Sequence, residues 1–577
     1  MPLFQKNHLY FMPEAEKILE HLGSLIKANT IFLASNDLKT NKIIKVLNKA
    51  EILVQEGSIP FQDSYCSTVV NNETSATVIK DTALHLKTKN MPPTKTIGPS
   101  CFVGFPIKLR NGELFGTLCA MDRNLIFTKE ELDLIVTVAK FLGYLIDLER
   151  DMYVDQVTGL NTKRFLEMYF EALPAKNKKN ISIFLINIDR FKFVNTTEAV
   201  GDHLLSAIAE RLNNISNNKG LVIRLYGDEF LIVHFGLTTN HERSLYAEQL
   251  LETIAKPIQM KYQTLNLSAR IGISSYNGDE KTNLDTVIQQ ATFAMDEITG
   301  KRSKRYLLCT ENIILKKERH MWIEANLINE LEENKFEMYY QPQFGLESNN
   351  ITGFESLIRW NTEKYGFISP AEFIPIAEST GHIIPLGNWI FSTVCKQMSE
   401  WNKLYGTNYS IAINISPAQL NHYGQYVDML DDILIKYGIL PEQLHFEITE
   451  TSFLHLSDQI VPLLEKIKNK GIHIALDDFG TGYSSVLYLR DLPINIIKID
   501  RVFVKELTIN ERDKKIIKTL IELARSLRIQ VVAEGIEDEV TLHHLKSLGC
   551  HSAQGYLLGK PMESVAAEKL LTENLKN

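Results

Sequence analysis

Short apolar runs that end on a polar residue recur in the C-terminal part of the chain. Runs of this length are typical of buried strands. Successive polar positions lie 21 to 36 residues apart, which leaves room for a loop and a helix, such as 511–527 or 537–548. The pattern predicts β/α units that close into a barrel, with a site at the carboxyl ends of the strands. The runs are Ser410–Ile413 before Asn414, Leu444–Phe446 before Glu447, Ile472–Leu476 before Asp477, Asn495–Ile497 before Lys498 and Gln530–Ala533 before Glu534.

The preceding part of the chain alternates strand-like and helix-like patterns. Strand-like runs at 102–107 and 114–120 flank Asn111-Gly112, a strong hairpin signal. Further strands are predicted at 181–188, 221–225 and 230–235, and connecting helices at 130–150 and 312–334. We therefore expect a multidomain α/β and α+β protein with units at 1–148, 149–308 and 309–577.

Composition narrows the classes of function. A chain of 577 residues is too long for one core. Its net charge of -8 argues against DNA or RNA as a main partner. The six cysteines are scattered, as in a protein with reduced thiols; Cys66 is expected to be a small buried hydrophobe, with a reactive thiol as the alternative. Because the sequence shows no signal peptide and no apolar run of about 20 residues, we expect a cytoplasmic protein without a membrane partner.

The polar residues after the C-terminal runs are mainly carboxylates. Asp477 and Asp478 are adjacent and precede a loop with Gly480 and Gly482. A single Asp in such a place could cap a helix, whereas two favour binding of divalent cations. A donor set of oxygens without cysteine selects Mg²⁺ or Mn²⁺ over zinc. Lys498 could balance this charge, or orient or deprotonate a water molecule.

Six short motifs lie in the C-terminal part of the chain, four of them at the ends of the apolar runs: Glu355-Ser356-Leu357, Asn414-Ile415-Ser416, Glu447-Ile448-Thr449-Glu450, Asp477-Asp478-Phe479-Gly480, Lys498-Ile499-Asp500 and Gln554-Gly555-Tyr556. Through them, residues from 336 to 562 resemble the EAL domain, the cyclic-di-GMP phosphodiesterase family. The resemblance implies a barrel with one reversed strand, which the periodicity does not reveal. It further implies hydrolysis of cyclic-di-GMP to linear pGpG with two Mg²⁺ or Mn²⁺ ions.

The resemblance also implies a role for each motif residue. Lys498 would position the attacking water, with Glu355 and Glu534 beside it as catalytic residues. Glu450 would brace the loop after Asp478. The implied substrate contacts are Gln341, Arg359 and Gln554. The implied metal ligands are Glu355, Asn414, Glu447, Asp477, Asp478 and Glu534.

Residues 149–308 resemble the GGDEF domain, the diguanylate cyclase family, through Asp155–Leu160, Asp189–Asn195, Gly201-Asp202 and Tyr226–Phe230. Two departures indicate a degenerate domain. Asn187 stands where the family has a metal-binding Asp, and Tyr226 stands at the first signature glycine. A nucleotide-binding remnant, with GTP as its ligand, would consist of Asn195, Asp202, Asp228 and Glu229. The alternative is a structural spacer.

The first unit resembles a GAF domain through Ser64-Tyr65-Cys66, Gly104-Phe105-Pro106 and Gly116-Thr117-Leu118-Cys119. This implies a sensor whose ligand the sequence does not identify, in a protein that we expect to be a homodimer. Three functions remain: a regulated phosphodiesterase, which the complete EAL motif set favours; a bifunctional cyclase and phosphodiesterase; and a catalytically silent nucleotide receptor.

Overall fold

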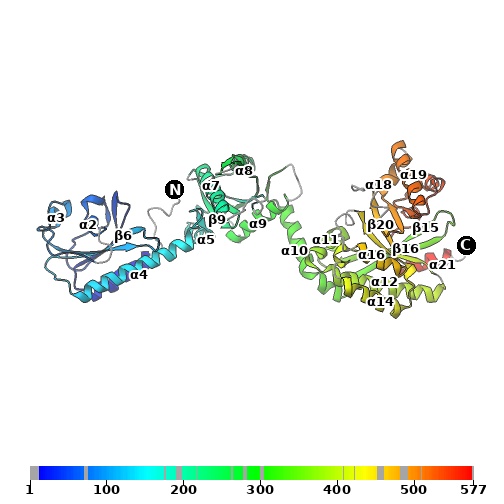
Figure 1. Cartoon of the computed structure of the whole chain (residues 1–577), viewed down its shortest axis with the longest axis horizontal. Helices are drawn as coiled ribbons and strands as arrows, with labels where there is room; N and C mark the ends of the chain where they lie inside the picture. The colour runs from blue at the N-terminus through cyan, green and yellow to red at the C-terminus, as the bar shows by residue number, and fades with distance from the viewer. Residues whose placement is uncertain are drawn as a thin grey trace. The chain divides into compact units, whose positions relative to one another are not determined.

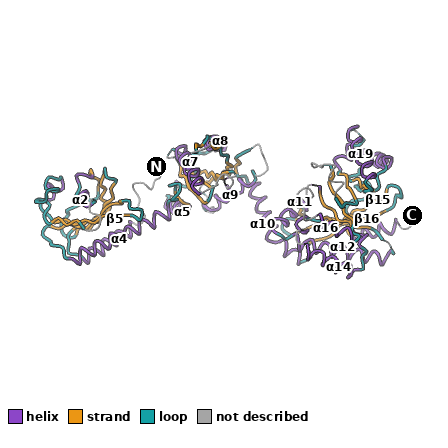
Figure 2. Tube along the Cα trace, in the orientation of Figure 1, coloured by secondary structure: helices purple, strands orange, loops and turns teal. Residues whose placement is uncertain are grey.

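The computed structural model divides into two compact units, Met1–Leu315 and Lys316–Asn577, which are described separately. The described residues are 12–70, 76–174, 177–189, 191, 198–217, 219–260, 264–276, 278, 283–298, 304–406, 408–420, 423–450, 461–480, 492–508 and 510–574. Figures 1 and 2 trace the elements along the chain. Among the described residues, no helix is long and apolar enough to cross a membrane.

The first sheet is antiparallel, in the order β3-β2-β1-β6-β5-β4. Helices α1 (Met12–Leu25) and α4 (Lys129–Tyr153) pack on one face, and α2 (Cys66–Val69) and α3 (Pro92–Ile97) lie on the other. The hairpin between the last two long strands turns at Gly112, whose φ of 83° suits glycine. The strands are β1 (Thr30–Asn36), β2 (Thr40–Asn48), β3 (Gly57–Pro60), β4 (Thr77–Ile79), β5 (Cys101–Lys108) and β6 (Leu114–Asp122).

The second sheet follows the order β14-β13-β8-β10-β9-β7. Successive side chains of its strands point to opposite faces, and helices cover both faces. Helices α5 (Lys163–Ala172) and α9 (Leu284–Asp296) cover one face, and α7 (Glu198–Ser216) and α8 (Asn240–Ala255) cover the other. A small ribbon, β11 (Ile258–Gln259) and β12 (Thr264–Leu265), stands apart. The strands are β7 (Asn161–Thr162), β8 (Ile181–Ile188), β9 (Gly220–Tyr226), β10 (Glu229–Phe235), β13 (Ala269–Tyr276) and β14 (Tyr306–Leu308).

The C-terminal unit is a closed barrel of eight strands. Its order is β16-β18-β19-β20-β21-β22-β23-β15, and β15 pairs back with β16. Strand β15 runs antiparallel to both neighbours, while the others run parallel. The predicted barrel is confirmed, including the reversed strand that the family resemblance implied. The strands are β15 (Phe336–Gly345), β16 (Ile351–Thr362), β18 (Ser410–Asn414), β19 (Leu444–Thr449), β20 (His473–Phe479), β21 (Ile496–Ile499), β22 (Gln530–Ala533) and β23 (Ser552–Ala553).

Helices and two short edge strands surround this barrel (Figure 1). Helix α10 (Glu311–Glu332) leads into it, and from Lys316 onward its apolar side packs on the barrel, with Trp322 stacked on Trp360 at 6.0 Å between ring centroids. The others are α11 (Pro370–Thr380), α12 (Ile383–Tyr405), α13 (Pro417–Leu420), α14 (Tyr423–Tyr437), α16 (Val461–Asn469), α18 (Arg501–Glu506), α19 (Glu511–Ser526), α20 (Glu539–Leu548), α21 (Ser564–Asn574), β17 (Gly366–Ile368) and β24 (Met562–Glu563).

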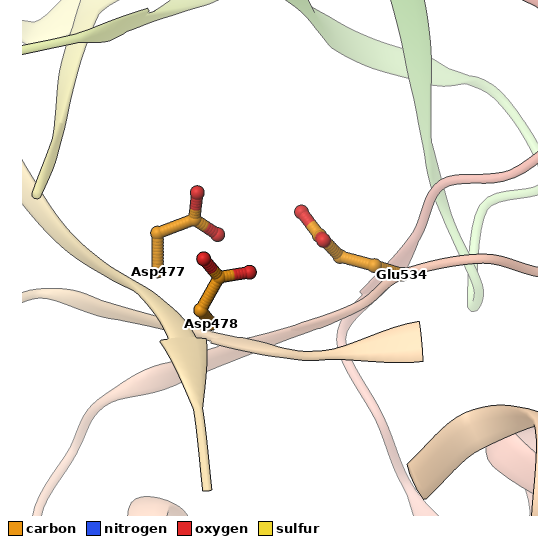
Figure 3. Close-up of side chains that lie close together, drawn as sticks. All are labelled: Asp477, Asp478 and Glu534. Atoms are coloured by element: carbon orange, nitrogen blue, oxygen red, sulfur yellow. The ribbon is translucent and has the colours of Figure 1, made fainter. Parts of the chain in front are cut away.

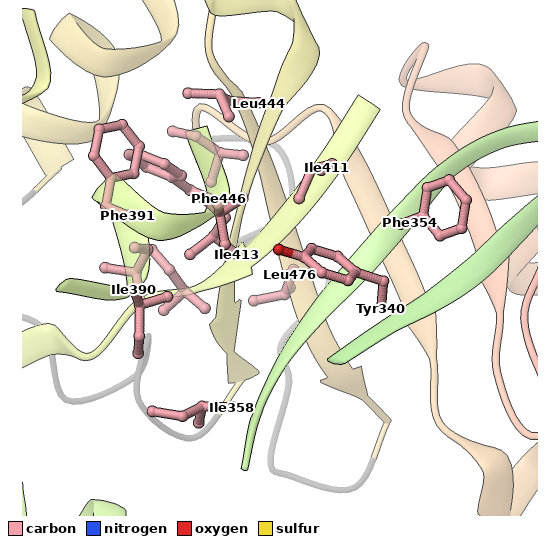
Figure 4. Packing of buried hydrophobic residues seen from close by; sticks show 14 of the residues in the cluster. Tyr340, Phe354, Ile358, Ile390, Phe391, Ile411, Ile413, Leu444, Phe446 and Leu476 are labelled. Atoms are coloured by element: carbon pink, nitrogen blue, oxygen red, sulfur yellow. The ribbon is translucent and has the colours of Figure 1, made fainter. Parts of the chain in front are cut away.

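The main core of this unit lies between the barrel strands and their covering helices. Phe391 on α12 meets Phe446 on β19 at 6.0 Å between ring centroids, and Ile411 and Ile413 on β18 extend the same apolar layer (Figure 4). The outward side chains of the strands thus pack against the helices. The inward side chains at the carboxyl ends are left to form a polar site.

Candidate active site

Lys498 on β21 lies at the centre of four carboxylates inside the barrel. Its Nζ is 2.7 Å from Glu534, 2.9 Å from Glu447, 3.2 Å from Asp477 and 3.3 Å from Glu355. The lysine side chain is 1% exposed. A charged group is buried in this way only where opposite charges replace its hydration, so the carboxylates and the ammonium hold one another in place.

Each member of the cluster comes from a different strand, and strand register brings them together. Asn414 on β18 pairs with Glu447 on β19, and Thr449 pairs with Asp477 on β20. The sequence pattern placed these polar residues at the carboxyl ends of their strands. In the structure Asn414 ends β18 and Glu534 directly follows β22, while Glu447, Asp477 and Lys498 lie near the carboxyl ends of theirs. The side chains of Glu447 and Asp477 point inward, where they meet the Lys498 ammonium.

Asp477 and Asp478 lie on the same side of the sheet although they are consecutive. In a regular strand, consecutive side chains point to opposite faces. Here the pairing of β20 with β21 shifts between Leu476 and Phe479, and Asp478 has a φ of 56°, in the left-handed region. The bulge turns both carboxylates toward Glu534, and ligand oxygens of the three lie within 4.8 Å of one another (Figure 3).

Side-chain amides form a second layer around Glu355. Asn414 Nδ2 donates to one carboxylate oxygen at 3.1 Å, and Gln554 Nε2 donates to the other at 2.7 Å and to Gln341 Oε1 at 2.9 Å. Gln343, which sequence reasoning missed, donates to Gln554 Oε1 at 3.0 Å. The signal that could have identified it is the period of two on β15, which puts Gln341 and Gln343 on one face.

A pocket of about 230 Å³ opens beside these groups. Glu355, Asp477, Glu534, Gln341 and Gln554 line it. It is also lined by residues to which sequence reasoning gave no role, namely Leu357, Arg501, Gly535, Glu537, Gly555 and Tyr556.

Arg359, expected to contact substrate, does not line this pocket. It lies two residues beyond Leu357 on the same strand, with its guanidinium 5.5 Å from the Tyr339 ring centroid and Nη1 donating to the Ile358 carbonyl.

Glu450 follows β19 and contacts the turn after the two aspartates. Its Oε2 accepts a hydrogen bond of 2.7 Å from the Gly480 amide, although the side chain is 2% exposed. The loop from 481 to 491 lies outside the described residues, as does Asn195 of the nucleotide remnant.

Crowding of the carboxylates perturbs their protonation. Burial, reinforced by Asp477, raises the pKa of Asp478 to about 6 and that of Glu534 to about 7. Burial also raises the pKa of Glu447 well above its usual value. The pKa of Glu355 is lowered, because Lys498, Gln554 and Asn414 together outweigh its burial. Burial lowers the pKa of Lys498, but the four carboxylates outweigh this and raise it well above normal. Lys498 therefore stays protonated.

The donor set fits hard divalent cations. Asp477 Oδ1 is buried and accepts no hydrogen bond, although it faces the Lys498 ammonium. Carboxylate oxygens of Asp478 and Glu534 lie within 4.8 Å of an oxygen of Asp477 and of each other. Carboxylate and amide oxygens are the ligands that Mg²⁺ and Mn²⁺ prefer.

In the second sheet, the guanidinium of Arg270 lies beside Asn187, the position where the GGDEF resemblance implies a metal ligand. Asn187 Oδ1 accepts a hydrogen bond of 3.0 Å from Arg270, and Asn187 Nδ2 reaches Glu229 at 3.5 Å. Arg270 also pairs with Asp189 at 3.0 Å. Tyr226 is 71% exposed at the end of β9, beside the turn of Gly227 and Asp228. Asp202 lies on α7 and is half-buried.

Three family models match the chain in order. The GAF domain matches residues 14–146, the "Diguanylate cyclase, GGDEF domain" matches 152–305 and the EAL domain matches 324–561. The chain therefore belongs to the EAL domain proteins that carry GAF and GGDEF domains ahead of the barrel.

Two curated relatives come from Pseudomonas aeruginosa. One, named bifunctional diguanylate cyclase/cyclic di-GMP phosphodiesterase MucR, is 33% identical over 72% of this chain and 61% of its own length. The other, named cyclic di-GMP phosphodiesterase NbdA, is 29% identical over 72% of this chain and 54% of its own length. The chain thus spans less than two thirds of either. A solved structure titled PaMucR Phosphodiesterase, c-di-GMP complex is 38% identical, covers 43% of this chain and 99% of that chain, and has a TM-score of 0.41.

Proposed function

We propose that the protein hydrolyses cyclic-di-GMP to linear pGpG in its C-terminal barrel, with two Mg²⁺ or Mn²⁺ ions. The observation that carries the proposal is the set of buried carboxylates around Lys498 at the mouth of a pocket, within a barrel of the EAL family. The names of the relatives MucR and NbdA support the same substrate and reaction.

Charge balance supports two cations rather than one. Five acidic side chains contribute −5 when ionised, and Lys498 contributes +1, which leaves −4 for two divalent ions to neutralise. The ligands would be Glu355, Asn414, Glu447, Asp477, Asp478 and Glu534. When bound, the ions would polarise the phosphodiester and promote ionisation of the attacking water.

The protein's own side chains would orient the reactants. The surrounding carboxylates raise the pKa of Lys498, which supports a role as a hydrogen-bond donor that orients the attacking water. Gln341 and Gln554 present amides at the pocket wall, where they can hold the substrate. Arg359 lies two residues beyond Leu357 on β16 and would offset the negative charge of the substrate phosphate.

The GGDEF domain is proposed to be inactive as a cyclase. Asn187 supplies no negative charge where phosphoryl transfer needs a metal ligand, and Arg270 places a positive charge on the same carboxamide. Binding of GTP would then be a regulatory function of this domain. Its ligands would be Asp202, Asp228, Glu229 and Asn195, the last of which lies outside the described residues.

A homodimer in the cytoplasm is the proposed form of the protein. Along α4, Phe141, Tyr144, Leu148 and Met152 are 39 to 58% exposed and recur every three or four residues. Such an apolar stripe on one side of a long helix is suited to pairing with a second copy. A ligand in the GAF domain, or GTP, would regulate hydrolysis by shifting this pairing.

The test incubates the purified chain with cyclic-di-GMP and Mg²⁺ or Mn²⁺ and identifies products by chromatography. We expect pGpG, complete loss of turnover with excess EDTA, and little turnover with Ca²⁺, whose looser coordination activates water poorly. Glu355→Ala and Asp477→Ala should each abolish turnover while leaving the fold intact. Binding without turnover in the unmodified protein would instead indicate a nucleotide receptor.

A further inference from the structure

Two buried cysteines contact each other on the face of the first sheet that α2 and α3 cover. Cys66 begins α2 and is 2% exposed, and Cys119 lies in β6 and is fully buried. Their Sγ atoms are 4.0 Å apart, in van der Waals contact. The two residues are 53 positions apart in sequence, so only the fold brings the thiols together.

The backbone makes room for this pair at Gly104. A Cβ at that position would lie 3.2 Å from the Cys119 Sγ and 2.5 Å from a methyl group of Val69 on α2. Gly104 pairs with Cys119 across β5 and β6. The glycine therefore allows α2, and Cys66 with it, to approach the sheet closely enough for thiol contact.

One residue of the pair borders a cavity. Cys66 lines a pocket of about 530 Å³ whose walls include Ile59, Tyr65, Ile97 and Met121. Cys119 does not line the pocket and lies behind Cys66. Cys66 is therefore the residue of the pair that a solute in the pocket would meet first.

Buried polar side chains lie in the same part of the domain as the thiols. Asn41 is 1% exposed and lines the pocket, and its Oδ1 has no hydrogen-bond partner. Thr117 is fully buried with an unpartnered hydroxyl, and it shares the face of β6 that carries Cys119. Asn36, which pairs with Asn41, also has unpartnered amide atoms. A core that only needed small hydrophobes would not bury such groups, because each costs about 1–3 kcal/mol.

We propose that Cys66 and Cys119 form a peroxide-reactive dithiol site. The Cys66 sulfur attacks one oxygen of a small hydroperoxide, the O–O bond breaks, and Cys66 becomes a sulfenic acid as the peroxide is reduced to water or an alcohol. The Cys119 thiol then attacks the sulfenic sulfur, which forms the disulfide and releases a second molecule of water. Two electrons pass from the two thiols to one peroxide.

The electrostatics agree with this order of events. The contact with Cys119, together with Thr117 and Asn41, lowers the pKa of Cys66 against the effect of burial. Burial raises the pKa of Cys119 well above its usual value. The thiolate is the nucleophile in attack on a peroxide, and the lowered pKa belongs to Cys66, the residue that borders the pocket.

The test treats the full chain with hydrogen peroxide, alkylates remaining thiols in denaturant, and maps cysteine states by peptide mass spectrometry. We expect a Cys66–Cys119 disulfide to form at peroxide doses that leave Cys395 and Cys550 reduced. In Cys119→Ser, Cys66 should stop as a sulfenic acid that dimedone traps. Cys66→Ser should give neither product, and the matched control Cys395→Ser should behave like the unmodified chain.

A second set of variants separates reactivity from mere proximity. Thr117→Val, which is isosteric, and Asn41→Leu each remove a polar group beside the sulfur, and should slow peroxide reaction by about tenfold if the pKa of Cys66 rises by one unit. Circular dichroism checks that each variant is folded. The proposal is overturned if Cys66 reacts no faster than Cys395 in the folded chain, or if oxidation leaves both thiols unlinked.

Discussion

At the residue scale, Lys498 is the position on which the barrel site depends. It is the central cation among four carboxylates, of which three are buried and Glu534 is half-buried, so its removal leaves uncompensated negative charge in the interior. By contrast, the pair Lys470–Asp431, at 2.6 Å, is partly exposed to solvent. The two lysines make a matched comparison of buried and exposed ion pairs.

We predict that Lys498→Met lowers hydrolysis of cyclic-di-GMP by about 10²–10³-fold, because a positioned donor is lost. In EDTA, the variant should also lose about 3–5 kcal/mol of stability, with part of it regained in Mn²⁺. Thermal unfolding with and without metal measures this. Lys470→Met should change either quantity little. Unchanged stability of Lys498→Met in EDTA would refute the structural part of the prediction.

At the element scale, the bulge of β20 decides where the two aspartates point. Glu450 holds the backbone after the bulge through its bond to the Gly480 amide. It lies outside the proposed ligand set, so its effect on metal binding would pass through the geometry of this turn.

We expect Glu450→Ala to raise the Mg²⁺ concentration needed for half-maximal activity by about 10–100-fold. Activity titrated against Mg²⁺ gives this value directly. Glu465→Ala, on the exposed side of α16, is the control and should leave the titration unchanged. A fall in maximal rate with an unaltered Mg²⁺ requirement would show that Glu450 does not act through the metal site.

A second element-scale feature is a histidine pair at the start of β19 and β20. The rings of His445 and His473 stack at 5.1 Å between centroids, with nitrogens 3.3 Å apart. Burial, with a smaller effect of His473, lowers the pKa of His445 to about 3, and burial lowers the pKa of His473. The unfolded chain binds protons near pH 6.5, where the folded chain does not. This pair therefore costs stability as pH falls below 6.5.

We predict that, between pH 7 and pH 5, the unmodified protein loses about 1–2 kcal/mol more stability than His445→Gln. The site carboxylates with raised pKa values act in the opposite direction, so the difference between the two proteins at each pH is the quantity to measure. Denaturant unfolding provides it. His543→Gln, on the exposed side of α20, should follow the unmodified protein.

At the scale of the whole molecule, the proposed lack of cyclase activity rests on Asn187, which stands where the GGDEF resemblance implies a metal-binding Asp. Asn187 sits opposite Glu229 in the register of β8 and β10. We predict no synthesis of cyclic-di-GMP from GTP. The measurement uses the Glu355→Ala background, which cannot consume the product. Asn187→Asp alone should not restore synthesis, since Tyr226 and Arg270 remain. Product in the single Glu355→Ala variant would contradict the prediction.

Regulation is also a property of the whole molecule. Two long helices connect successive domains in the sequence: α4 lies between the first and second domains, and α10 precedes the barrel. A helix transmits a shift better than a flexible linker does. We expect GTP to change the hydrolysis rate of the full chain and to leave a fragment of residues 311–577 unaffected. Equal rates of chain and fragment, with a monomeric full chain in sedimentation, would contradict this expectation.

The sequence by itself determined which chemistry the barrel could hold. Apolar runs with polar ends predicted strands such as β18 and β22, because strand burial depends on local pattern. Oxygen ligands without cysteine predicted the class of metal, because ligand preference depends on residue type. The departures at Asn187 and Tyr226 were readable for the same reason.

Only the tertiary structure decided how these residues meet. The inward position of Glu447, the bulge that turns Asp477 and Asp478 to one side, and the bond of Gln343 to Gln554 all depend on strand register. The contact of Cys66 with Cys119 depends on packing of α2 on the sheet beside Gly104. Register and packing are set by contacts between residues far apart in the chain, and local periodicity carries no record of such contacts.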